Sequence, residues 1–170
     1  MHLSHLLRAA CIALVALSLG SCANNKKTGS QYGATDSDSV NGTALPDRQE
    51  GVSFLGENVD RNKFSPVHFG YDSFAVGGEE RGKIHEVAEF MRSSSKSIII
   101  AGFTDERGTP EYNRGLGERR AQSVRSALIS AGADGSRLQT VSFGAEMPAD
   151  AGSGESAWGK NRRAEFGVVR

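Results

Sequence analysis

Residues 97–121 read SIIIAGFTDERGTPEYNRGLGERRA, and this stretch decides the fold. The apolar run at residues 98–100 does not alternate with polar residues, which is typical of a central strand covered on both faces. Thr109 and Pro110 then fit the N-cap and the first turn of a helix, which we expect to continue to about Ala131. The stretch therefore predicts a loop between the end of a buried strand and the start of a helix. In open α/β layers, ligand groups tend to bind at such strand ends.

Two opposite charges belong to this stretch, Asp105 in the loop and Arg120 on the helix. Arg120 shares a helix face with Leu116 and with Asn113, which is closest to the loop. Arginine forms planar bidentate pairs with a carboxylate, and an aspartate accepts hydrogen bonds from an ammonium group. If the two charges converge at the start of the helix, they form a pocket for a zwitterion such as an amino-acid head group. The backbone N–H groups near Thr109 offer further contacts to an anion.

Other interpretations of these charges stay open at this point. Asp105 and Arg120 can pair with one another, or with Arg107 and Glu118, and the helix face is then only a solvated surface. An enzyme would need a nucleophile or an acid–base pair within reach. Asp105 and Glu106 are neighbours in an extended loop and point apart, so we expect no catalytic residue.

Charge and composition bear on the kind of ligand. The chain has 20 Lys and Arg residues against 20 Asp and Glu residues, a formal net charge of zero. No global field therefore favours nucleic acid, and we expect none as a partner. His68 and His85 stand alone, without a cysteine or a second histidine at metal-ligand spacing. We therefore expect no metal and no cofactor.

The rest of the domain alternates between strand and helix patterns. Residues 67–71, 138–143 and 164–168 alternate as strands, whereas residues 79–92 and 155–162 carry helical patterns. The predicted order is β-α-β-α-β-(short α)-β, and the last strand can pair antiparallel after its short crossover. This order predicts a sheet with helices packed on it.

The N-terminus predicts export and lipidation. Residues 6–19 form an apolar run that is too short to span a bilayer as a helix and is shaped like a secretory signal. The LGSC sequence that ends at Cys22 resembles the lipobox of bacterial lipoproteins. We therefore expect residues 1–21 to be a signal peptide and Cys22 to carry the acyl chains. An ordinary secretory signal with a coincidental cysteine is the alternative.

A tether is expected between the lipid and the domain. Residues 22–60 are rich in Gly, Ser, Asn, Asp and Thr, and no helix or strand period holds among them. Such a segment buries too little apolar surface to order itself, so we interpret it as flexible. Residues 52–55 are the one part that could pack on the domain edge instead. The folded domain is expected at residues 61–170, with its first strand pattern near Phe64.

Several motifs together closely resemble one family. They are Gly102, Thr104–Asn113, Leu116–Ala121, Ser142–Gly144 with Pro148, and Lys160–Ala164. This set is similar to the peptidoglycan-associated lipoproteins, the Pal family, which carry an OmpA-like C-terminal domain. The resemblance covers about Phe64 to Arg170, and the lipobox and the tether match the family layout. It implies an α+β OmpA-like domain with a mixed four-stranded sheet and helices packed on it.

The resemblance also implies a function. Members bind peptidoglycan non-covalently through the meso-diaminopimelate of its stem peptide. They are lipid-anchored in the outer membrane, face the periplasm, and act in a Tol–Pal system in membrane integrity and cell division. Asp105 and Arg120 match the two main ligand-binding positions of the family. Further positions that line or shape the pocket match Phe103, Thr104, Arg107, Asn113 and Leu116.

The chain departs from the family pattern at two positions, and a second function stays open. Phe103 stands where many relatives have His or Asn, and Gly70 stands where several have an acid. Asn161 and Arg162 either hold the last strand and its loop to the helix or touch the ligand. In the Pal family the same domain also engages the periplasmic protein TolB, so a protein-binding adaptor with little wall binding is the alternative function.

Overall fold

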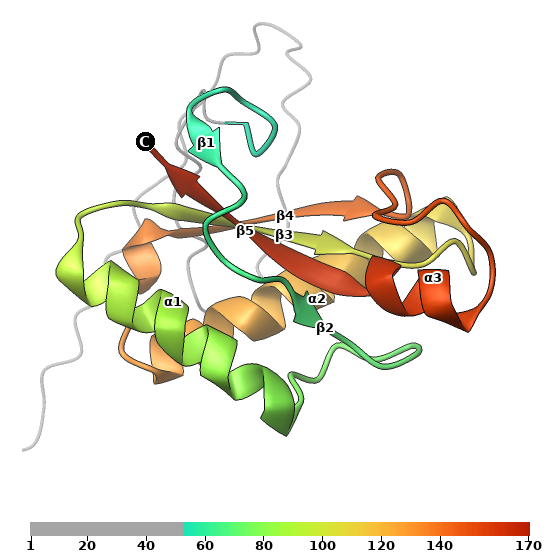
Figure 1. The fold of residues 1–170 in the computed structure, drawn as a ribbon, viewed down its shortest axis with the longest axis horizontal. Helices are drawn as coiled ribbons and strands as arrows, with labels where there is room; N and C mark the ends of the chain where they lie inside the picture. The colour runs from blue at the N-terminus through green and yellow to red at the C-terminus, as the bar shows by residue number, and fades with distance from the viewer. Residues whose placement is uncertain (1–52) are drawn as a thin grey trace, which may run out of the picture. The chain divides into compact units, whose positions relative to one another are not determined.

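The computed structural model describes residues 53–170, so the predicted signal peptide, Cys22 and most of the predicted tether lie outside the described residues (Figure 1). The strands are β1 Val59–Asp60, β2 Val67–His68, β3 Ile98–Phe103, β4 Leu138–Gly144 and β5 Arg163–Val169. The helices are α1 Arg81–Ser93, α2 Pro110–Ser130 and α3 Glu155–Asn161, with 3-10 turns at Gly78–Glu80 and Gly135–Arg137.

The sheet is mixed, as the sequence predicts. Its order is β1-β5-β3-β4, and β2 also pairs with β5. β3 and β4 are parallel, whereas β5 runs antiparallel to β3, to β1 and to β2. The antiparallel last strand is therefore confirmed. The sheet has five strands instead of the expected four, because β1 adds to the outer side of β5.

Helices α1 and α2 cover one face of the sheet (Figure 1). Ile98 and Ile100 of β3 point to this face, where they meet buried side chains of both helices, among them Met91 and Leu128. The stripe expected on the first helix is confirmed, since its buried residues are Ile84, Val87, Ala88 and Met91. This packing fixes the C-terminal end of β3 beside the start of α2.

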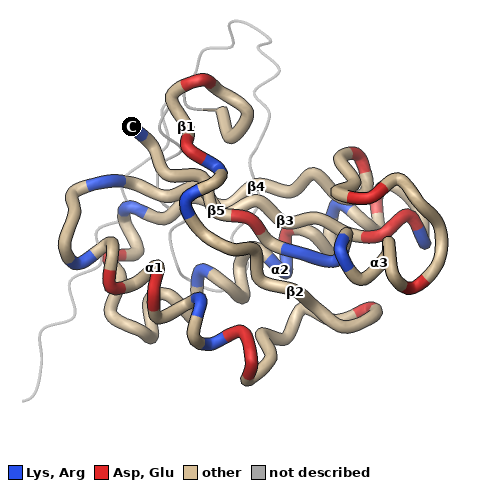
Figure 2. Tube along the Cα trace, in the orientation of Figure 1, with Lys and Arg blue, Asp and Glu red and all other residues tan. Residues whose placement is uncertain are grey.

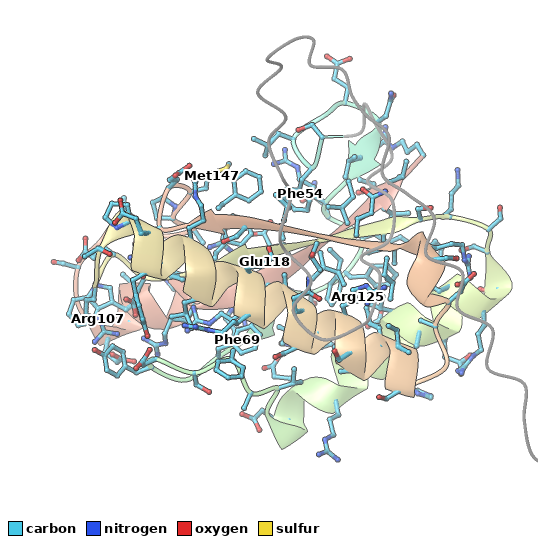
Figure 3. The ribbon with its side chains drawn as sticks, turned by 180° about the vertical axis from the view of Figure 1, so that it is seen from behind. Phe54, Phe69, Arg107, Glu118, Arg125 and Met147 are labelled. Atoms are coloured by element: carbon cyan, nitrogen blue, oxygen red, sulfur yellow. The ribbon has the colours of Figure 1, made fainter. Side chains whose placement is uncertain are left out.

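The other face of the sheet is covered by the segment before β1. Phe54 is buried there with Ile99, Ala101 and Phe103 of β3, and Figure 3 shows Phe54 and Met147 together on this side. The folded unit therefore begins before residue 60, earlier than the strand pattern near Phe64 indicates. The physical reason is that Phe54 closes an apolar face that the helices do not reach.

Two glycines bring α2 close to the end of β3. A Cβ atom on Gly102 would lie 1.9 Å from the carbonyl oxygen of Gly117, and one on Gly117 would lie 2.3 Å from the Ser142 hydroxyl. Only residues without a side chain allow this approach. As a result, side chains of the first turns of α2 can reach the backbone at the end of β3.

Charges of both signs are interspersed along the described chain, and neither sign gathers into one large field (Figure 2). Among residues 53–170, no helix is both long enough and apolar enough to cross a membrane.

Candidate functional site

A cavity of about 180 Å³ opens where the loop after β3 meets the start of α2. The segment after β2 forms its third wall. The lining residues are Tyr71, Asp72, Thr104, Asp105, Arg107, Gly108, Tyr112, Leu116 and Arg120. Asp105 and Arg120 therefore converge on one cavity, as their spacing predicts.

Arg120 is fully buried beneath this cavity. Its Nη1 donates to the carbonyl of Phe103 at 2.8 Å, its Nε to that of Ser73 at 2.8 Å, and its Nη2 to that of Gly70 at 3.3 Å. A guanidinium has five N–H donors, so these three bonds leave two for a ligand. Burial lowers the pKa of Arg120 to about 10, and nearby Asp105 acts in the opposite direction. The group is therefore still charged at neutral pH.

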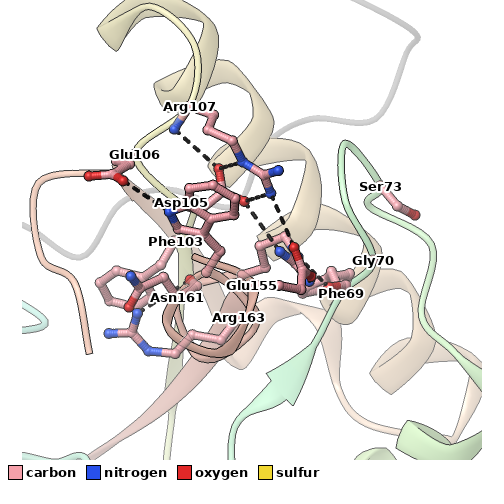
Figure 4. Close-up of polar contacts among 12 residues, drawn as sticks. Phe69, Gly70, Ser73, Phe103, Asp105, Glu106, Arg107, Glu155, Asn161 and Arg163 are labelled. Atoms are coloured by element: carbon pink, nitrogen blue, oxygen red, sulfur yellow. Dashed lines mark hydrogen bonds and ion pairs between the residues drawn. The ribbon is translucent and has the colours of Figure 1, made fainter. Parts of the chain in front are cut away.

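Asp105 is buried across the cavity and pairs with two other arginines. Its Oδ2 accepts from Arg107 Nη2 at 2.6 Å (Figure 4), and from Arg162 Nη1 at 3.4 Å. Its Oδ1 accepts from the backbone N–H and the Nε of Arg107, both at 3.2 Å. Burial acts to raise the pKa of Asp105, but the hydrogen bonds from Arg107 and Arg162 outweigh it and hold that pKa below its usual value. The pairing with Arg107 matches one open alternative from the sequence, whereas a direct Asp105–Arg120 ion pair does not form in the described chain.

Arg107 is held between two aromatic rings. Its guanidinium lies 4.1 Å from the ring centroids of both Tyr71 and Trp158. Trp158 Nε1 in turn donates to the carboxylate of Glu106 at 2.9 Å. Glu106 thus points away from Asp105, as expected for neighbours in an extended loop. Arg107 therefore connects the cavity to the ring of Tyr71 on one side and to Trp158 of α3 on the other.

Of the remaining predicted site residues, two line the cavity and two do not. Thr104 and Leu116 line the cavity, and the buried Thr104 hydroxyl has no hydrogen-bond partner in the structure. Phe103 offers only its carbonyl to Arg120, because its ring packs on the far face of the sheet, stacked on Phe143 at 5.3 Å. Asn113 lines a neighbouring hollow of about 220 Å³, and its buried Oδ1 also lacks a partner. Ligand contact by any of these residues stays a prediction.

Four lining residues are not among those expected from the sequence: Tyr71, Asp72, Gly108 and Tyr112. The hydroxyl of Tyr112 donates to the carboxylate of Asp72, which joins α2 to the segment after β2. Asp72 has a φ of 49°, a left-handed conformation that is uncommon for residues other than glycine. Its place directly after a strand pattern was the one available signal, and it indicated only a turn.

Asn161 and Arg162 hold the structure together around the site. The Asn161 side chain accepts from the Asp150 N–H at 3.0 Å and donates to the Asp150 carbonyl at 2.8 Å. Arg162 Nε donates to the Phe69 carbonyl at 3.0 Å, and its Nη2 donates to Glu155 at 2.5 Å. The holding role expected from the sequence is therefore present for both residues, and Arg162 also touches Asp105.

A metal would find few ligands here. Within residues 53–170, no group of three or more His, Cys, Asp or Glu side chains is arranged to hold an ion. The polar groups that line the cavity are instead the guanidinium groups of Arg107 and Arg120, the carboxylates of Asp72 and Asp105, and the hydroxyls of Tyr71, Thr104 and Tyr112. This set suits an organic ligand that carries charges of both signs.

Comparison with known proteins first identifies the class of protein to which the chain belongs. The OmpA family matches residues 68–162, more than half of the chain, so the chain belongs to the OmpA family. The matched region begins in β2 and ends directly before β5, and it contains Asp105 and Arg120.

Close relatives narrow the class. The chain is 38% identical over 126 residues to the peptidoglycan-associated lipoprotein of Pasteurella multocida, covering 72% of this chain and 84% of the relative. The crystal structure of the peptidoglycan-associated lipoprotein from Burkholderia pseudomallei matches with a TM-score of 0.61 and 35% identity, covering 68% of this chain and 99% of that one. The chain is thus a member of the peptidoglycan-associated lipoprotein family. The C-terminal domain of Helicobacter pylori MotB, 24% identical with a TM-score of 0.58 over 63% of this chain and 85% of that one, shares the fold alone.

Proposed function

We propose that this chain is a lipoprotein of the outer membrane that binds peptidoglycan non-covalently, as part of a Tol–Pal system that holds the membrane to the wall. The ligand group is the distal centre of meso-diaminopimelate, which carries one ammonium and one carboxylate. The names of the relatives support the peptidoglycan and lipoprotein parts of the proposal. The cavity supports the choice of a zwitterion.

The observation that supports the proposal most strongly is that Arg120 is buried and keeps two N–H groups that are not used by the three backbone carbonyls. A buried charge is strongly unfavourable unless it is paired, and here three backbone carbonyls share it without neutralising it. A ligand carboxylate would complete the pairing through the two remaining N–H groups. Asp105 lies on the same cavity and supplies the negative group for an ammonium.

The test changes the ligand, because changing Arg120 would also disturb the fold. The full chain in mild detergent is titrated with three stem peptides that differ at one centre. The first ends in meso-diaminopimelate, the second in lysine, which lacks the distal carboxylate, and the third in 2-aminopimelate, which lacks the distal ammonium. Tightest binding of the first peptide supports the zwitterion site. Equal binding of the lysine peptide would refute the role of Arg120.

A binding role, as opposed to catalysis, is tested with whole cell-wall sacculi. We expect the full chain to sediment with the sacculi and to release no soluble fragments. An Asp105→Asn variant should sediment less, whereas a Glu146→Gln variant, altered on the surface beside the neighbouring hollow, should sediment as wild type. Release of soluble muropeptides would point to a hydrolase, and a chain that stays in the supernatant would favour the adaptor function.

A protein partner of the TolB type is part of the proposal. Tyr71, Phe74 and Tyr112 are exposed at or beside the cavity rim, and exposed aromatic rings are enriched at protein interfaces. If such a partner covers this rim, the diaminopimelate peptide should compete with it for the chain. Simultaneous binding of both would place the partner elsewhere.

The proposed location depends on Cys22. Its lipobox-like setting and the relatives' description as lipoproteins support acylation at this residue. Labelling with palmitate should reach the wild-type chain and not a Cys22→Ala variant, which should be released from the membrane fraction. Labelling of the variant would refute Cys22 as the lipid site.

A further inference from the structure

The carboxylate of Asp105 is already saturated by donors from the protein. Two donors of Arg107 converge on Oδ1, and one donor each from Arg107 and Arg162 reaches Oδ2. A carboxylate offers about four acceptor positions. An incoming ammonium therefore finds no free lone pair on Asp105 unless one of these donors leaves.

The Arg120 end of the site differs from the Asp105 end in the number of hydrogen-bonding positions that it leaves for a ligand. Arg120 keeps two N–H groups for a ligand, since its three bonds go to the carbonyls of Gly70, Ser73 and Phe103. A carboxylate can thus bind Arg120 without displacing anything. The ammonium end alone requires an exchange of partners.

Arg107 is freer to move than Arg162, although its guanidinium lies between the rings of Tyr71 and Trp158. Its side chain is 30% exposed, whereas that of Arg162 is 8% exposed and is tied to the carbonyl of Phe69. A second carboxylate is within reach, because Glu155 Oε2 lies 4.0 Å from Arg107 Nη2, while Glu155 Oε1 accepts from Arg162. The guanidinium can therefore leave Asp105 without losing every ionic partner.

We propose that the Arg107 side chain is an internal stand-in for the ligand ammonium and determines selectivity at the Asp105 end of the site. This inference rests on the proposed function and changes the role expected of Arg107 from ligand contact to competitor. A ligand carboxylate docks on Arg120 first. Its ammonium then exchanges with the Arg107 guanidinium on Asp105, and the displaced side chain turns to Glu155. A ligand without the ammonium leaves Arg107 in place.

The experiment compares two affinities in each variant. The full chain in detergent is titrated with the meso-diaminopimelate peptide and with the matched 2-aminopimelate peptide, and the ratio of the two affinities is the readout. Arg107→Ala removes the competitor and should raise this ratio about tenfold, since the ammonium no longer displaces a charge-assisted pair. Arg114→Ala is the matched control. It also removes one arginine near the site, but that arginine pairs with Glu146 on the surface, and the ratio should not change.

A second measurement uses the unaltered chain. In arginine-labelled protein, the NMR signal of the Arg107 Nε–H group should shift strongly with the diaminopimelate peptide and little with the 2-aminopimelate peptide. A ratio that stays the same or falls in Arg107→Ala, or an Nε–H signal that responds equally to both peptides, would overturn the inference and leave the proposed function standing. If wild type and variants alike bind neither peptide, the proposed function fails, and the competitor role fails with it.

Discussion

Replacing Arg120 by lysine should damage the fold as well as the site. The guanidinium meets the carbonyls of Gly70, Ser73 and Phe103 with three different nitrogens. A single ammonium nitrogen can reach about one of them, so two bonds from a charged donor are lost. At about 1.5 kcal/mol each, the lower end of the range for charged donors, the loss in free energy of unfolding is about 3 kcal/mol. For a domain of this size, each 1 kcal/mol lowers Tm by about 4 °C, so we expect a fall of about 12 °C.

Thermal unfolding followed by circular dichroism measures this loss, and Arg119→Lys is its control. Arg119 is the neighbouring residue on α2, but it is exposed, and its guanidinium lies 5.7 and 5.9 Å from the ring centroids of Phe74 and Tyr112. Its substitution should change Tm by no more than about 2 °C, as is usual for surface positions. An Arg120→Lys variant that melts within 3 °C of wild type would refute the reasoning, because the three carbonyls would then not depend on the guanidinium fork.

Three further changes test other parts of the structure. Asp105→Asn should weaken binding of the diaminopimelate peptide by about tenfold or more. Because the folded pKa of Asp105 is lowered, its contribution to the free energy of unfolding is complete above about pH 4 and is lost as pH falls through the folded pKa. The variant should therefore lose less stability than wild type in acid unfolding curves, and equal losses would contradict this. Gly102→Ala should prevent normal folding, since its Cβ would meet the Gly117 carbonyl oxygen at 1.9 Å, and a native circular dichroism spectrum would contradict the close approach. Phe54→Ala should reduce the free energy of unfolding by about 3 kcal/mol in urea titrations, and no loss would mean that the segment before β1 does not belong to the core.

Local signals explain why the centre of the fold could be predicted. The Thr109 hydroxyl accepts from the Tyr112 N–H, as the N-cap pattern indicates, and Pro110 begins α2. The apolar run at the start of β3 lies in the middle of the sheet. Each of these features depends on residues within one turn or one strand, which is the range over which sequence patterns are informative.

β1 could not be predicted in the same way. It has two residues, and its register with Val169 is fixed by contacts from the far end of the described chain. No period of apolar residues marks it, because Phe54 and Val59 are the only buried residues between residues 53 and 60. Composition therefore predicts a tether for this segment, with packing of residues 52–55 on the domain edge as the alternative, and the burial of Phe54 favours that alternative.

The candidate site was predictable only in part, for a similar reason. The 3.6-residue period placed Arg120 on the face of Leu116, and both line the cavity. The path of the segment after β2, which brings Asp72 to the cavity, depends on loop geometry that no periodic pattern encodes. For Phe103 a usable signal was available, because the period of two along β3 places its ring on the same face as Ala101, away from α2.

The central place of β5 has a consequence for the time at which the domain can fold. The last strand of the described chain lies between β1 and β3, and the N–H of Arg170 donates to the carbonyl of Asn58. Until those final residues have been synthesised, β1 and β2 have no strand to pair with and β3 has one bare edge. Ribosomes add residues one at a time, at about 5–20 per second, so the sheet cannot be completed until β5 has been synthesised. The proposed export through a narrow membrane channel would benefit from this delay, because the chain would meet the channel before its sheet is complete.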